Sequence, residues 1–159
     1  MNSTMRFLGV LLISGIALLS CNKDKAATKP SIKITSLNGN FIPFGGTLVV
    51  EMDFTDKEGD ISNTIFVQKI RKNIRTTATI RDTFSLAVPS FPSKSSGEIQ
   101  LALDYNNYLV SAINPPKVGT PPNQRNEDDT LEIRFVLRDL AGNVSDTASA
   151  GTVIVSRNN

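Results

Sequence analysis

Histidine is absent from the 159 residues of this chain, and with it the side chain that most often transfers protons near neutral pH. This absence excludes Ser-His-Asp and Cys-His catalysis and every histidine-based metal site. Tryptophan is also absent, so the commonest flat surface for stacking against sugars is missing. The single cysteine, Cys21, allows neither an internal disulfide nor a thiolate metal site. We therefore expect a protein that is not an enzyme.

A strong charge of either sign is absent as well. The chain has 17 basic and 15 acidic residues, which gives a formal net charge of +2. So small an excess predicts no nucleic-acid partner, because binding to a phosphate backbone relies on a strongly positive surface.

Near its start the chain carries an apolar segment typical of an export signal. Residues 7–19 are low in polarity and follow Arg6. A helix of this length spans about 20 Å, whereas the hydrocarbon core of a bilayer is roughly 30 Å thick. The segment therefore suits a secretion signal better than a membrane span, and we predict that residues 1–20 are a cleaved signal peptide.

The junction after this segment, formed by Leu18, Leu19, Ser20 and Cys21, resembles the lipobox of bacterial lipoproteins. The resemblance implies cleavage before Cys21 and attachment of lipid to its thiol, which makes the membrane a partner through a lipid anchor. Two or three acyl chains on one residue would hold the protein stably. The alternative is ordinary cleavage near Ser20 and a free thiol.

Residues 21–30 are polar and predict a lipidated cysteine followed by a flexible tether. Lys23 and Asp24 resemble part of the signal that sends some Bacteroidota lipoproteins to the cell surface. The resemblance implies an outer-membrane location and leaves open whether the domain faces the cell surface or the periplasm.

The remaining residues, 31–157, predict one all-β domain. Short runs with alternating apolar side chains are separated by Gly, Pro, Asn and Asp, a pattern typical of strands and turns. These runs cover residues 31–37, 47–54, 63–70, 77–88, 98–103, 131–137 and 147–155. In three of them the alternation predicts the buried face, formed by Leu48, Val50, Met52 and Phe54, by Ile99, Leu101 and Leu103, and by Leu131, Ile133, Phe135 and Leu137. About seven short strands indicate a two-sheet antiparallel sandwich of immunoglobulin (Ig)-like type. A short helical turn is expected at residues 110–113.

Two segments support this interpretation by resemblance. Residues 54–61 (FTDKEGDI) resemble a segment after the second strand in Ig-like domains of Bacteroidota lipoproteins. Residues 138–145 (RDLAGNVS) are similar to a turn before the last strand of bacterial Ig-like and cadherin-like modules. Both segments imply a fold rather than an activity.

Acidic residues in and near these two segments suggest a calcium site. The candidate ligands are Asp53, Asp56, Glu58, Asp60 and Asp139. Calcium takes six to eight oxygen ligands, but the spacing here is not that of an EF-hand. The alternative is a pair of turns in which glycine supplies a positive φ and aspartates bind local amides. Calcium is the only cofactor that the residues suggest, and none is required.

A candidate binding surface combines Tyr105, Asn106, Asn107 and Tyr108 with the proline-rich residues 114–130. Tyrosine offers rigid contact area and asparagine offers adaptable hydrogen bonding, a mixture suited to a glycan or a protein partner. Loops this long inside one domain are usually functional or disordered. The alternative is a solvated connection with the tyrosines packed on the edge of the sandwich.

A local basic stretch contains Lys69, Arg71, Lys72, Arg75 and Arg81. These side chains could meet lipid phosphates or acidic polysaccharide. A solvated or edge-protecting strand accounts for them equally well, since charges on an exposed edge prevent strand addition.

Taken as a whole, the chain predicts a membrane-anchored lipoprotein with a non-catalytic binding or adhesion module for a glycan or a protein. The alternative is a structural accessory subunit of an outer-membrane protein complex, docked by strand addition or by the proline-rich loop. A small hydrolase using a carboxylate pair, such as Asp128 and Asp129, is a third class that remains to be tested.

Overall fold

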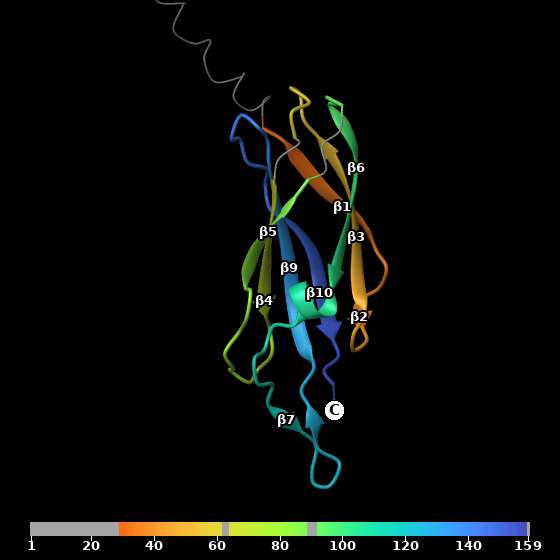
Figure 1. The fold of residues 1–159 in the computed structure, drawn as a ribbon, viewed down its shortest axis with the longest axis vertical. Coiled ribbons are helices and arrows are strands. Elements are labelled where there is room, and N and C mark those ends of the chain that lie inside the picture. The colour runs from red at the N-terminus through yellow and green to blue at the C-terminus, as the bar shows by residue number, and fades with distance from the viewer. Residues whose placement is uncertain (1–28, 62–63, 89–91, 159) are drawn as a thin grey trace, which may run out of the picture.

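A computed structural model describes residues 29–61, 64–88 and 92–158. Regular structure in these residues is almost entirely β-strand (Figure 1). The elements are β1 (Ser31–Leu37), β2 (Phe41–Ile42), β3 (Thr47–Thr55), β4 (Thr64–Arg71), β5 (Thr83–Ala87), β6 (Ser96–Asp104), η1 (Tyr105–Leu109), β7 (Lys117–Val118), β8 (Arg125–Asn126), β9 (Asp129–Arg138) and β10 (Ala148–Val155). The all-β prediction is confirmed.

These strands form three sheets. One sheet has the order β1-β3-β6 and a second has the order β2-β10-β9-β4-β5. Neighbouring strands are antiparallel in both, except that β2 runs parallel to β10. The short strands β7 and β8 form a separate hairpin. The strands β1 and β2 belong to different sheets, so residues 31–42 contribute to both of the larger sheets.

The core lies between the two larger sheets, because alternate side chains of each strand point inward. On β3 the buried residues are Leu48, Val50, Met52 and Phe54, the face predicted from the sequence. The predicted faces of β6 and β9 are buried as well, through Ile99, Leu101, Leu103, Leu131, Ile133, Phe135 and Leu137. Each fully buried side chain of this size contributes about 1.5–3 kcal/mol, which makes this shared core the main source of stability.

Two predictions of local structure, the strand at residues 77–82 and the helical turn at residues 110–113, are wrong. Residues 77–82 do not extend β5, because Arg81 has a φ of 50° and the Ile80 N–H donates to the carbonyl of Ser111. The predicted helical turn at 110–113 lies at η1 instead. There the Asp104 carboxylate accepts from the N–H of Asn107 and begins the turn.

The proline-rich segment, residues 114–130, contains regular β-structure and is not a continuous loop. It contains the β7-β8 hairpin, and β9 already begins at Asp129. The hairpin extends from the same end of the domain as the C-terminus (Figure 1).

The chain enters the domain at the opposite end. Ser31 pairs with Thr55 at the end of β3, and the Lys29 ammonium group binds the carboxylate of Asp146 in the β9-β10 loop. The predicted signal peptide and Cys21 lie outside the described residues. Within the described residues, no helix is long and apolar enough to cross a membrane.

Candidate functional site

The β3-β4 loop begins with a tight turn around Asp56. Its Oδ2 accepts a hydrogen bond from the Asp60 N–H at 2.9 Å, and its own N–H donates to the Ser95 carbonyl at 2.8 Å. Gly59 has a φ of 70°, and a Cβ at this position would lie 2.8 Å from Ser93 Oγ. The predicted turn with glycine at a positive φ is therefore confirmed for this loop.

The β9-β10 loop forms a second turn, around Asp139. Its Oδ1 accepts from the Asn143 N–H and its Oδ2 from Asn143 Nδ2, both at 2.7 Å. Gly142 has a φ of 91°, as expected for the glycine of this turn. The Leu140 N–H donates to the Asp60 carbonyl at 3.0 Å and joins the two loops.

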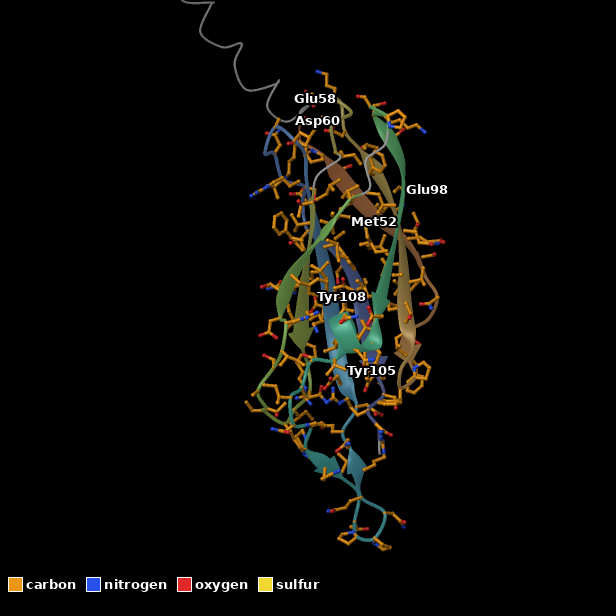
Figure 2. All side chains as sticks on the ribbon, in the orientation of Figure 1. Met52, Glu58, Asp60, Glu98, Tyr105 and Tyr108 are labelled. Carbon is orange, nitrogen blue, oxygen red and sulfur yellow. The ribbon has the colours of Figure 1, made fainter. Side chains whose placement is uncertain are left out.

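The two loops bring Asp56, Asp60 and Asp139 together. Asp60 lies at the end of the domain where the chain enters (Figure 2). One carboxylate oxygen from each residue lies within 4.8 Å of the other two. Asp56 and Asp139 are buried and Asp60 is half-buried. Burial, together with the neighbouring Asp56 and Asp139 carboxylates, raises the pKa of Asp60. We call these three residues the acidic trio.

The other two predicted calcium ligands lie apart from the acidic trio. Asp53 is exposed on β3, where it pairs with Lys33 and Glu98 in the neighbouring strands. The strand alternation that turns Met52 and Phe54 inward turns Asp53 outward. Glu58 belongs to the same loop as the trio, but its side chain is exposed.

The tyrosine segment forms η1 and is largely packed against the domain. Tyr105 is 4% exposed, and its ring centre lies 5.0 Å from that of Phe44 in an edge-on contact. Tyr108 is half-buried, with its ring centre 5.1 Å from that of Phe84. The part of the predicted binding surface that remains exposed is Asn106, Asn107 and one side of Tyr108, while Tyr105 is removed from it by burial.

The basic stretch is not a continuous exposed surface, because two of its members point into the domain. Lys69 is 2% exposed and donates from Nζ to the Val110 carbonyl at 3.0 Å. Burial lowers the pKa of Lys69 to about 8. The Arg71 side chain is only 5% exposed. The strand alternation of β4 places Lys69 on the same face as buried Ile65 and Val67, so its burial can be predicted from the sequence.

A buried ion network surrounds Asp129 at the base of the β7-β8 hairpin. Its Oδ1 lies 3.2 Å from Arg71 Nε, and its Oδ2 lies 3.4 Å from a guanidinium nitrogen of Arg157. Oδ2 also accepts from the N–H groups of Ser111 and Ala112. Arg71 binds Glu127 as well. Four distant segments thus meet at one carboxylate, and their contacts hold the hairpin in place.

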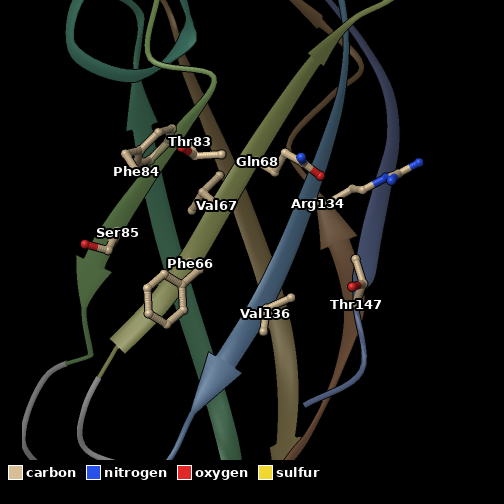
Figure 3. A pocket seen from close by; sticks show the side chains of 9 residues that line it. All are labelled: Phe66, Val67, Gln68, Thr83, Phe84, Ser85, Arg134, Val136 and Thr147. Atoms are coloured by element: carbon tan, nitrogen blue, oxygen red, sulfur yellow. The ribbon is translucent and has the colours of Figure 1, made fainter. Parts of the chain in front are cut away.

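An apolar groove lies on the outer face of the larger sheet, across β4, β5 and β9 (Figure 3). Its volume is about 380 Å³, and its lining includes Phe66, Phe84 and Val136. The guanidinium carbon of Arg138 lies 5.2 Å from the centre of the Phe66 ring, which places a cation over an aromatic face.

Comparisons with known proteins identify no family. No family of proteins and no curated protein matches the sequence. Among solved structures, the sporulation control protein Spo0M from Bacillus subtilis is similar over 82% of this chain at 12% sequence identity, with a TM-score of 0.36. This chain spans about half the length of that protein, since the match covers 50% of it. A likeness this distant carries no argument about function.

Proposed function

We propose that this protein is a membrane-anchored lipoprotein with a non-catalytic Ig-like module that binds a glycan or a protein through its β7-β8 hairpin. The observation that carries the proposal is the opposite placement of two features. The chain enters the domain at the end that holds the acidic trio, whereas the hairpin extends from the other end (Figure 1). A lipid anchor before the domain would therefore present the hairpin away from the membrane.

The sheet order supports an Ig-like sandwich. Ig constant-type domains pair strands A, B and E in one sheet and C, F and G in the other. Here β1, β3 and β6 correspond to the first group, and β4, β9 and β10 to the second. In this interpretation the loops at the two ends are the variable parts of the module.

The length of the tether limits the distance between the domain and the lipid surface. Lys29 follows Cys21 by eight positions, and an extended chain spans at most about 3.5 Å per residue. The end of the domain with the acidic trio would then lie within roughly 30 Å of the lipid surface. The hairpin, at the far end of the longest axis, would remain accessible to a partner.

The hairpin has the properties of a binding element. Residues 119–125 at its tip are exposed, so their side chains are free to contact a partner. The network around Asp129 holds its base, because Arg71 binds both Asp129 and Glu127. A loop held at its base loses less conformational entropy on binding than a free one.

A structural accessory subunit is the second candidate, and the apolar groove favours it. Phe66 is 38% exposed on the face of a sheet, where an apolar side chain gains energy by being covered. A protein that packs across β4 and β9 would cover it. In this case the groove rather than the hairpin would be the contact surface.

An adhesion assay separates the two proposals. Cells that display the full chain would be tested for retention on immobilised glycans and on outer-membrane proteins. The test variant is Asn123→Ala with Gln124→Ala at the hairpin tip, and the matched control is Lys57→Ala with Glu58→Ala at the other end. We expect loss of retention for the tip variant alone. Equal retention by all three proteins would contradict the hairpin proposal. Loss on Phe66→Ser instead would support the accessory subunit.

A further inference from the structure

We infer that Asp56, Asp60 and Asp139 bind one calcium ion and so cross-link the β3-β4 and β9-β10 loops. The inference goes beyond the proposed function and does not depend on it, because it concerns the end of the domain opposite the hairpin. It rests on the spacing of the three carboxylates, on the burial of oxygens without partners, and on the pairing of charges around them.

The spacing fits the size of a calcium ion. Calcium–oxygen distances are about 2.4 Å, so two oxygens on opposite sides of one ion lie about 4.8 Å apart. The trio offers three oxygens that all lie within 4.8 Å of one another. Magnesium demands a near-ideal octahedron of ligands, whereas calcium accepts a flexible and irregular arrangement. Calcium therefore suits oxygens that come from two separate loops better than magnesium does.

Unpartnered oxygens mark the position of the ligand. Asp56 is 2% exposed, and its Oδ1 has no hydrogen-bond partner, whereas its Oδ2 already accepts from the Asp60 N–H. Oδ1 of Asp60 is also buried without a partner. A buried carboxylate oxygen that accepts nothing loses its hydration without compensation, which a bound cation would supply.

Charge pairing around the trio leads to the same conclusion. Among the residues that the structure describes, no lysine or arginine forms an ion pair with Asp56 or Asp60. The Lys29 ammonium group at this end binds Asp146 instead. A buried and a half-buried carboxylate side by side, neither paired with a cationic side chain, favour a divalent metal ion.

The site would be of moderate affinity and would act on loop structure. Three carboxylates leave several positions of the ion to water or backbone oxygens, and few protein ligands give weaker binding. Extracellular modules with such sites bind calcium at about 0.1–1 mM. The ion would add a second link between two loops that the Leu140 N–H and Asp60 carbonyl already join.

The test uses the full processed protein purified in detergent. Melting is followed by circular dichroism in EDTA and in 5 mM calcium chloride, and calcium binding is measured by calorimetry. We expect binding of one ion per chain and a rise in melting temperature of about 5 °C with calcium. Asp60→Asn should abolish both responses, and Glu58→Gln, an exposed acid of the same loop, should keep both.

A purely structural turn gives a different result. If the trio is only a turn, Asp60→Asn lowers the melting temperature equally with and without calcium. If the trio binds calcium, the variant melts in EDTA at or above the wild-type temperature, because repulsion between carboxylates is relieved. The inference is overturned if the wild type shows no heat and no shift up to 10 mM calcium, or if Asp60→Asn keeps the shift. An equal response to magnesium would overturn the assignment to calcium.

Discussion

Burial of Lys69 makes the stability of the domain depend on pH in the alkaline range. Burial lowers the pKa of Lys69 in the folded protein to about 8, from an ordinary value of 10.5. Below pH 8 the lysine is charged in both states, and the folded state bears the cost of a buried ammonium group. Between pH 8 and 10.5 the folded protein releases this proton while the unfolded chain keeps it, so stability rises with pH.

The magnitude follows from the difference between the two pKa values. Each pKa unit corresponds to about 1.4 kcal/mol, so the contribution of Lys69 changes by about 2–3 kcal/mol between pH 7 and pH 10. A Lys69→Met variant keeps an unbranched side chain, one heavy atom shorter, and removes the titration. At pH 7 we expect it to be more stable than the wild type, although it loses the hydrogen bond to the Val110 carbonyl. This advantage should disappear near pH 10.

Urea unfolding at a series of pH values measures the effect. The decisive quantity is the difference in unfolding free energy between variant and wild type, because tyrosine ionisation and other titrations occur in both proteins and cancel. Lys57→Met, which changes an exposed lysine, is the control and should show a small difference that does not vary with pH. A difference for Lys69→Met that stays constant from pH 7 to pH 10 would refute the reasoning.

Three further substitutions test the close packing of the core and compare a buried ion network with an exposed ion pair. A Cβ on Gly97 would lie 2.8 Å from the ring of buried Phe54, so Gly97→Ala should lower the free energy of unfolding by about 1–3 kcal/mol, and an unchanged urea midpoint would contradict this close packing. Asp129 is fully buried between Arg71 and Arg157, so Asp129→Asn should cost about 3–5 kcal/mol by removing the negative charge that both arginines contact. Asp146→Asn breaks an exposed ion pair with Lys29 and should change stability by less than about 1 kcal/mol. Similar losses for the two aspartate variants would show that burial does not decide the cost.

Local patterns were sufficient for most of the strands. Alternation along β3 predicted which side chains are buried, because a strand turns successive residues to opposite faces whatever it pairs with. The same rule, applied more strictly, would have placed Asp53 outside and Lys69 inside. The prediction failed at residues 77–82, where an alternating pattern is overridden by a hydrogen bond to the distant Ser111.

The sequence by itself determined the strands, the turns at Gly59 and Gly142, and a pool of acidic candidates near the two turns. Tertiary structure alone decided which acids meet, because Asp139 joins Asp56 and Asp60 only when the ends of β3 and β9 reach the same end of the domain. It also buried Tyr105 against Phe44 and gathered the partners of Asp129 from three other segments. Such contacts depend on distances between residues far apart in the chain, which local propensity does not encode.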